Sequence, residues 1–496
     1  MVVAVSNFGS ELPNSSPYAR RQSVPLRKFP PNALIRRLYG ASVLSNNGAQ
    51  WKRHRLILNE LFTEKAAAEH HHTIVQATQQ LIEQWRETLS KAQIERLEIK
   101  STTSKREDKT AAKQQALPDK AHIDLCQNFN ALFLKIVIQI TVGRSVDALK
   151  TNADNFLENL ACITKASTQP QHQFVRWWRF LPLPQNYRLT QALTEIDDFF
   201  EELIAQSRFT QHPSAESKET VQSTAVPPKT VLDKLLQASS ESAGCPLSQK
   251  EVKDNLLAII GNGYETAATT LSMTLQALAQ NSKALACSTE EVQSVIKKHG
   301  GQLTPAAVAE LVYVEAVLYE SMRLYPAVAG LQRVSLAADD GLAGWSIPAG
   351  QAVGVALQPL HLDSKFYGKA AETFVPERYL SHCEETRPAQ DIEKSFEAVA
   401  QAAAAESRCP FGRLMRKSKV ASSDSVALPL TFGYGARQCL AKHLALYEMK
   451  IVLAMLLNAF TFELVDEVPV ELELGKFGLF LSAFPKTAVT LAVGLH

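Results

Sequence analysis

Apolar residues recur along much of this chain at spacings of three and four, which is the pattern of helices with one buried face. The pattern predicts helices at about 49–91, 123–142, 189–207, 232–240, 250–278, 311–324 and 440–459. Short apolar runs next to turn-forming residues predict a small β element at 344–357 and strands at 460–464 and 489–493. We therefore expect a mainly α fold with a minor β part.

Four polar stretches interrupt the helical pattern. Residues 1–30 are rich in Ser, Pro, Asn and Arg and are interpreted as an irregular lead-in. Exposed insertions are expected near 101–120, 209–229 and 381–427. Length alone would divide the 496 residues into about three domains, but none of these stretches resembles a linker between separate cores.

Composition and charge exclude several classes of protein. The 46% of hydrophobic and 21% of charged residues are typical of a globular chain. The chain has 52 basic and 50 acidic residues, so its net charge is close to zero. This balance does not favour a nucleic-acid partner, because such partners are bound largely through positive charge. The seven cysteines contain no CxxC pair, which favours a reducing, intracellular compartment. The apolar runs are shorter than the roughly 20 residues of a bilayer span, so we expect no transmembrane anchor in this chain.

The stretch 174–180 (FVRWWRF) mixes aromatic residues with arginines. This composition is found in segments that lie in the interface of a membrane. A loop that places Trp178 and Phe180 in the core explains the same residues. Peripheral membrane contact and core packing therefore both remain open.

The strongest chemical signal is the stretch 432–441 (FGYGARQCLA). Its two glycines make a tight turn, and Cys439 follows immediately before a predicted helix. A helix N-terminus and the nearby Arg437 would both stabilise a thiolate. We therefore expect a low-pKa cysteine that serves as a nucleophile or a metal ligand, while a glycine-rich turn with a buried thiol is the alternative.

This stretch resembles the haem-binding loop FxxGxRxC of cytochromes P450. It matches at Phe432, Gly435, Arg437 and Cys439, and Ala441 stands where the family usually has glycine. The resemblance implies that Cys439 is the axial thiolate ligand of the iron in haem (iron protoporphyrin IX). The other six cysteines are then bystander thiols.

Two further motifs fit the same family. Glu320 and Arg323 match ExxR, and the segment 376–379 (PERY) resembles the family's PERF. The resemblance implies a buried charge triad of Glu320, Arg323 and Arg378 on the haem side of the core. The segment 361–368, which begins with His361, resembles the H-x-D turn that precedes PERF in the family.

A fourth match supplies candidate groups for the haem propionates. Trp51 and Arg55 resemble WxxxR, and residues four apart share a helix face. Arg333 fits the family's second propionate arginine, and Arg437 would be a third. Since residues from Trp51 to Cys439 must converge on one haem, the resemblance implies a single large domain over residues 31–496.

The helix predicted at 250–278 contains the segment 261–266 (GNGYET). It resembles the family's I-helix pattern (A/G)Gx(D/E)T at Gly263, Glu265 and Thr266. Glycine is unfavourable inside a helix, and a flat ligand close to the backbone would explain Gly263. The resemblance implies that Glu265 and Thr266 deliver protons to dioxygen, while a kinked core helix is the plain alternative. Asn262 replaces the usual small residue and could bind water, dioxygen or a substrate oxygen.

The resemblance implies a P450 fold with the haem between the long I-helix and the cysteine loop. It implies a monooxygenase that uses dioxygen and electrons from NAD(P)H, supplied by a partner reductase (P450 reductase or ferredoxin). The expected substrate is small and apolar, lipid- or terpenoid-like. The segment 180–184 is weakly similar to the fatty-acid and carotenoid hydroxylase branches of eukaryotes. The expected location is intracellular, with the membrane surface of the ER or of another organelle as a candidate place of action.

Two alternatives remain. Asn262 would suit an isomerase or lyase that rearranges hydroperoxides without a reductase, although Thr266 favours oxygen activation. Only 50 residues precede Trp51, fewer than in typical members of the family. This short N-terminal part is compatible with three possibilities. They are a truncated form that binds haem without activity, a splice form, and a real minimal version.

Overall fold

The computed structural model describes most of the chain with gaps. The described residues are 39–103, 120–144, 153–169, 177–211, 230–239, 246–328, 330–335, 339–342, 345–385, 428–465, 472–474, 483–485 and 489–495. The predicted lead-in at 1–30 lies outside them, as do residues 104–119, 212–229 and 386–427 of the predicted insertions.

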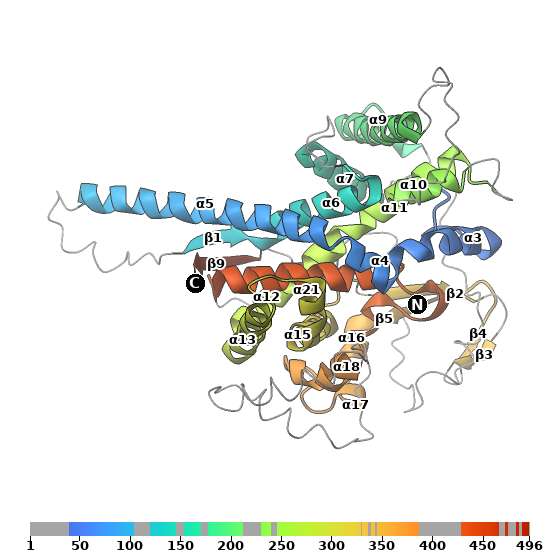
Figure 1. Cartoon of the computed structure of the whole chain (residues 1–496). Helices are drawn as coiled ribbons and strands as arrows, with labels where there is room; N and C mark the ends of the chain where they lie inside the picture. The colour runs from blue at the N-terminus through green and yellow to red at the C-terminus, as the bar shows by residue number, and fades with distance from the viewer. Residues whose placement is uncertain are drawn as a thin grey trace, which may run out of the picture.

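Long helices form the body of the molecule (Figure 1). The helices are α3 (Gly48–Asn59), α4 (Glu64–Glu69), α5 (His71–Thr103), α6 (Leu125–Val142), α7 (Ala153–Thr168), α9 (Pro184–Gln211), α10 (Val231–Gln237), α11 (Gln249–Gly263), α12 (Glu265–Gln280), α13 (Ser282–Lys298), α14 (Pro305–Glu310), α15 (Val312–Leu324), α16 (Leu357–His361), α17 (Ser364–Tyr367), α18 (Leu380–Glu385) and α21 (Lys442–Ala459). The mainly α expectation is confirmed.

Two of the predicted helices are interrupted. The helix predicted over 49–91 is broken by a 3-10 turn at Glu60–Phe62 and by a new N-cap at Thr63, whose side chain accepts a hydrogen bond from Ala66 N. The helix predicted over 250–278 is divided at Tyr264 into α11 and α12. Apolar periodicity continues across both breaks, so the pattern alone does not reveal them.

The strands form small antiparallel sheets. A three-stranded sheet has the order β1–β9–β6, from Ala121–Asp124, Thr490–Leu495 and Phe460–Leu464. The other three sheets are hairpin-like pairs: β2 (Gly330–Val334) with β5 (Ala352–Ala356), β3 (Asp339–Leu342) with β4 (Trp345–Ile347), and β7 (Leu472–Leu474) with β8 (Ala483–Pro485). The strands predicted at 460–464 and 489–493 and the β element at 344–357 are confirmed.

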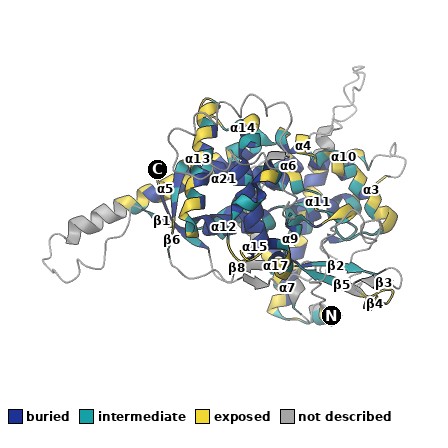
Figure 2. Cartoon of the chain, turned by 90° about the horizontal axis from the view of Figure 1, so that it is seen from below, coloured by how far each residue is buried: buried dark blue, intermediate teal, exposed yellow. Residues whose placement is uncertain are grey.

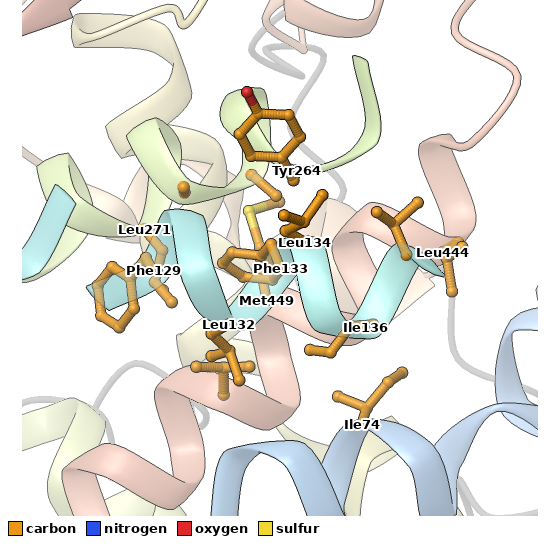
Figure 3. Packing of buried hydrophobic residues seen from close by; sticks show 14 of the residues in the cluster. Ile74, Phe129, Leu132, Phe133, Leu134, Ile136, Tyr264, Leu271, Leu444 and Met449 are labelled. Carbon is orange, nitrogen blue, oxygen red and sulfur yellow. The ribbon is translucent and has the colours of Figure 1, made fainter. Parts of the chain in front are cut away.

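The apolar core is centred on α6. Asp124 caps the start of α6 by accepting a hydrogen bond from Gln127 N, and Gly143 ends it with φ of +78°. The helix packs against α5, α10, α11 and α12, and Figure 3 shows its Phe133 and Leu134 beside Met449 of α21. By length and composition α6 could cross a membrane, but 61% of it is buried inside the protein. Figure 2 shows the buried positions concentrated where α12, α15 and α21 meet.

Candidate functional site

The loop before α21 holds Cys439 in a fixed place. Cys439 N donates a hydrogen bond of 2.8 Å to the carbonyl of Phe432, which closes the loop upon itself. Gly433 and Gly435 have φ of +70° and +74°, which side-chain-bearing residues rarely adopt. The glycines of the sequence motif are therefore required by the backbone of this turn, and Phe432 supplies the carbonyl that anchors the cysteine.

The thiol of Cys439 has an environment that differs from the sequence-based prediction. Cys439 as a whole residue is exposed to solvent. Its thiol group is nevertheless desolvated by the surrounding protein, and this desolvation raises the thiol pKa. The backbone N–H of Ala441 and the charges of Arg55 and Lys442 oppose this shift without cancelling it. The predicted low-pKa thiolate is therefore wrong for the protein alone. A thiol of this kind is deprotonated when it coordinates a metal ion, so the site suits a ligand better than a free nucleophile.

The other described cysteines do not share this position. Cys126, Cys162 and Cys383 are free thiols, as expected for bystanders. Cys287 of α13 is disulfide-bonded. The prediction of bystander thiols is wrong for Cys287.

Arginines from three distant segments gather beside the cysteine loop. Arg55 of α3 donates a hydrogen bond of 2.8 Å to the carbonyl of Gln438, directly before Cys439. Arg437 donates to the carbonyl of Asn46 at 2.9 Å, and its guanidinium carbon lies 4.1 Å from the ring centre of Trp51. Burial, together with the charges of Arg333 and Arg55, lowers the pKa of Arg437 to about 10. The structure thus brings together the predicted Trp51, Arg55, Arg333 and Arg437.

One donor of this group, on Arg437, is left without an acceptor in the part of the chain that the structure describes. Nη1 of Arg437 is buried without a hydrogen-bond partner among the described residues. Burial also lowers the pKa of Arg55 and of Arg333, as expected for cations held away from water. A buried donor without a partner is costly, so a bound group with carboxylates would satisfy the cluster. The residues therefore fit haem, with a thiol to bind iron and guanidinium groups to bind propionates.

Helix α3 is fixed relative to α11 by a second polar contact. His54 is buried, and its Nε2 lies 3.1 Å from Oε1 of Glu251, which also pairs with Arg53. Glu251 is itself part of the capping box that starts α11 with Ser248. Trp51 and Arg55, one turn apart on α3, are thereby held at the cysteine loop.

The predicted charge triad is present in the core. Glu320 and Arg323 of α15 are completely buried, and Arg323 Nε and Nη2 donate to the two carboxylate oxygens of Glu320 at 2.8 and 2.9 Å. Arg378 Nε donates to Oε1 of Glu320 at 3.1 Å. Arg323 also donates to the carbonyls of His361 and Ala371. The buried charges are thus paired and fully hydrogen-bonded, as buried ion pairs must be.

His361 joins the triad to the cysteine loop. Its Nδ1 lies 3.2 Å from the carbonyl of Arg323, and its Nε2 accepts a hydrogen bond of 3.0 Å from the backbone N–H of Leu430. Because Nε2 accepts, the ring is neutral with its proton on Nδ1. Burial lowers the His361 pKa to about 4, which keeps this tautomer charge-free. The sequence marked His361 as part of a turn motif, but its bridging role depends on a contact across 69 residues.

The break at Tyr264 places Glu265 and Thr266 at the first turn of α12. Thr266 Oγ1 donates to the carbonyl of Asn262 at 3.1 Å, and Thr270 Oγ1 donates to Thr266 O at 2.8 Å. Burial raises the pKa of Glu265 to about 7. A carboxyl group with this pKa exchanges protons near neutral pH, which suits a general acid.

Gly263 has a packing reason that the sequence did not reveal. A Cβ at this position would lie 2.7 Å from Cγ2 of Val137 on α6. The residue is therefore small because α6 passes close to it. This contact is a packing reason for the glycine, and the close approach of a flat ligand to Gly263 stays a prediction.

Asn262 is engaged by its own helix. Its Nδ2 donates to the carbonyl of Ala258 at 2.7 Å. Burial raises the pKa of Tyr39, and the side chain of Asn262 opposes this shift. Tyr39, which sequence analysis did not single out, is buried against this part of α11. A lone tyrosine ahead of the first predicted helix carries no pattern that would have identified it.

The aromatic segment lies at the surface. Trp177 is 61% exposed and Phe180 is 73% exposed, and Tyr187 at the start of α9 is 66% exposed. The alternative that placed Phe180 in the core is therefore wrong. The three rings form the membrane-contact candidate of the described chain.

Comparison with known proteins agrees with this site. The family model described as Cytochrome P450 matches residues 27–490. The chain is similar to "Cytochrome P450 monooxygenase acrD" of Aspergillus aculeatus, at 26% identity over 69% of this chain and 59% of that protein. It is similar to "Carotene epsilon-monooxygenase, chloroplastic" of Arabidopsis thaliana, at 24% identity over 72% of this chain and 59% of that protein.

A third relative is "Probable cytochrome P450 6d5" of Drosophila melanogaster, at 28% identity over 53% of this chain and 44% of that protein. The matched part thus spans about half the length of these curated relatives. The described motifs all lie inside the residues that the family model covers.

Proposed function

Because the chain belongs to the cytochrome P450 family, we propose that it is a haem-thiolate monooxygenase that hydroxylates a small apolar substrate. The observation that carries the proposal is the convergence of Cys439 with Arg55, Arg333 and Arg437. These groups come from segments far apart in the sequence, and they offer one metal ligand together with donors for carboxylates. Haem needs this combination of groups.

Each residue has a proposed part in holding the cofactor. Cys439 is the axial ligand, and the N–H of Ala441 stabilises its sulfur. Arg55, Arg333 and Arg437 bind the propionates, and Trp51 supports Arg437 through its ring. When bound, haem supplies the chemistry that activates dioxygen with two electrons.

Glu265 and Thr266 are proposed to handle protons. The Glu265 carboxyl is half-protonated near pH 7, so it can give a proton and regain one from solvent. The Thr266 hydroxyl is fixed by its bond to Asn262 O at the break between α11 and α12. Asn262 uses the Nδ2 of its amide to bind Ala258 O. The hydroperoxide isomerase alternative, which depended on a free amide at this place, is therefore less well supported.

The partners follow from the same family. We propose that electrons come from NAD(P)H through a partner reductase, either P450 reductase or a ferredoxin. A lipid- or terpenoid-like substrate is supported by the printed name of the Arabidopsis thaliana relative, a carotene monooxygenase. The exposed Trp177, Phe180 and Tyr187 support peripheral contact with an organelle membrane. One buried cluster that includes residues from Tyr39 to Val493 supports a single large domain.

The proposal is tested by reconstitution. The purified chain is loaded with haem and mixed with P450 reductase or with ferredoxin and its reductase, and candidate fatty acids, carotenoids and sterols are screened by their effect on the haem spectrum. Hits are incubated with NADPH and isotopically labelled dioxygen. One labelled oxygen atom in the product supports the proposal. Turnover of a fatty hydroperoxide without NADPH, and no oxygen incorporation with it, would contradict it.

A further inference from the structure

One amide of α11 holds both α3 and the backbone that leads into it. Asn255 is completely buried, and its Oδ1 accepts a hydrogen bond of 2.8 Å from Val43 N. Its Nδ2 lies 2.7 Å from the carbonyl oxygen of Glu251 and 3.1 Å from Nδ1 of His54 on α3. Nε2 of His54 lies 3.1 Å from Oε1 of Glu251. These four residues, Val43, His54, Glu251 and Asn255, are named the latch here.

The partners in the latch determine where its protons lie. The N–H of Val43 can only donate and the carbonyl of Glu251 can only accept, so Asn255 must direct Oδ1 to the first and Nδ2 to the second. The second N–H of Nδ2 then faces Nδ1 of His54, which must accept it. The proton of His54 is therefore on Nε2, which donates it to Oε1 of Glu251. The latch thus requires a neutral imidazole ring.

A protonated His54 does not fit this arrangement. A proton on Nδ1 would face an N–H of Asn255, so two donors would meet in a site without water. Turning the amide over would set Oδ1 against the carbonyl of Glu251 and Nδ2 against the N–H of Val43. Buried donors and acceptors without partners are costly. The bond to Val43 is the one that can open, because Val43 is only half-buried and its N–H can turn to solvent.

The surroundings of His54 favour the neutral ring. The charged groups that face it are Glu251 of α11 and Arg53 of its own helix, whose Nη2 lies 3.4 Å from Nε2 of the ring. On α10, which packs against α3, Lys234 is paired with Glu60 beyond the end of α3. Burial, together with the charge of Arg53, outweighs Glu251 and lowers the pKa of His54 below 6.5.

Two of the arginines assigned to the haem propionates depend on the segments that the latch holds. Arg55 directly follows the latched histidine, and its Nη1 donates a hydrogen bond of 2.8 Å to the carbonyl of Gln438. The carbonyl of Asn46, three residues after Val43, accepts a hydrogen bond of 2.9 Å from Nη2 of Arg437. An open latch would therefore loosen both guanidinium groups.

We propose that His54 and Asn255 are positioning residues for the cofactor, and that they hold Arg55 and Arg437 in place only while His54 is neutral. Acid opens the latch at Val43, and haem is then held less firmly. The inference rests on the proposed function, because it assumes that these arginines bind haem propionates.

The test follows the hydrogen exchange of the backbone amides of residues 39–47 by mass spectrometry in the full-length, haem-loaded protein. Protection factors, corrected for the intrinsic exchange rate, are measured between about pH 8 and about pH 5. The unchanged protein should lose about tenfold in protection as the pH falls below 6.5. His54→Asn keeps an acceptor near the position of Nδ1 and cannot be protonated, so it should lack this step. His299→Asn, which removes a histidine paired with Glu310, is the matched control and should keep it.

The rate of haem transfer to excess apomyoglobin gives a second readout. Over the same pH range this rate should rise about tenfold more in the unchanged protein than in His54→Asn, because the arginines loosen only in the former. Asn255→Asp places an acceptor opposite Nδ1, so a protonated His54 is paired and the acid-induced loss of protection should disappear.

Three results would overturn the inference. They are an unchanged protein without the step in protection, a step of equal size in His54→Asn, and a step that persists in Asn255→Asp. The Asn255→Asp variant keeps the shape of the side chain, so it tests the latch even where His54→Asn folds poorly. A chain that takes up no haem would instead contradict the proposed function, and the exchange of residues 39–47 can still be titrated in that chain.

Discussion

Glu265 shows how far the surroundings change the chemistry of one residue. The sequence identified it by its place beside Thr266, and the structure adds burial that raises its pKa to about 7. The thiol pKa of Cys439 shifts in the opposite direction to the expectation, because desolvation of the thiol outweighs the backbone N–H of Ala441 and the charge of Arg55. Sequence reasoning finds such residues by motif, but their protonation depends on how many distant atoms surround them.

The first prediction concerns the pH dependence of turnover. If Glu265 donates a proton, the acid form is active and the rate falls as the pH rises through about 7. Glu265→Gln should lower kcat on the order of 100-fold and remove this descending limb. The measurement is kcat against pH with a saturating substrate and reductase. A limb that persists unchanged in Glu265→Gln would show that another group donates the proton.

The elements that hold the haem side are joined by buried polar contacts. Glu320 and Arg323 on α15 bind Arg378 of the PERY turn, and His361 binds both α15 and the cysteine loop. Thr431 Oγ1 adds a bond of 3.0 Å to the carbonyl of Met322. The motifs predicted which charged residues meet. They did not predict the bridge through His361, because the hydrogen-bond partners of a histidine leave no periodic signal in the sequence.

The second prediction concerns the triad. Arg323→Met leaves the carboxylate of Glu320 buried beside only one arginine and should lower the free energy of unfolding by about 3–5 kcal/mol. The matched control is Lys234→Met, which breaks the exposed pair with Glu60 and should cost less than about 1 kcal/mol. Denaturant unfolding of both variants checks the difference. Equal losses would contradict the buried role of Arg323.

The third prediction concerns His361 and acid. Its pKa is lowered from 6.5 to about 4 in the folded protein, so the unfolded chain binds the extra proton between these pH values. Stability should therefore fall as the pH drops from about 6.5 to about 4, by on the order of 3 kcal/mol from this residue. His361→Gln cannot titrate and should lose that share of the pH dependence. If the free energy of unfolding depends on pH in the same way in both proteins, His361 is not the group responsible.

The whole molecule is arranged so that segments far apart in the sequence meet at one site. Apolar periodicity predicted several of the long helices and the strands β6 and β9, and the family motifs identified the haem-side residues. The helices α7 and α13, the break at Tyr264 and the strands β1 and β2 were not predicted. The break and the strands depend on long-range contacts, such as Gly263 with Val137 or β1 with β9, which no local pattern encodes.

The fourth prediction concerns the outer surface. Trp177→Ser and Phe180→Ser should together weaken co-sedimentation with vesicles of phosphatidylcholine and phosphatidylserine at least tenfold, because both rings are exposed and suited to an interface. Leu56→Ser, at an exposed position on α3, is the matched control and should bind like the unchanged protein. Equal binding by all three proteins would exclude this segment as the contact.

The central claim is that Cys439 ligates haem iron as a thiolate. It is tested most directly by the difference spectrum of the reduced, CO-bound protein. The unchanged protein and Cys162→Ser, which alters a free thiol on α7, should both show the thiolate-type Soret shift. Cys439→Ser should lose it. A protein that takes up no haem, or a Cys439→Ser variant that keeps the thiolate-type shift, would contradict the account.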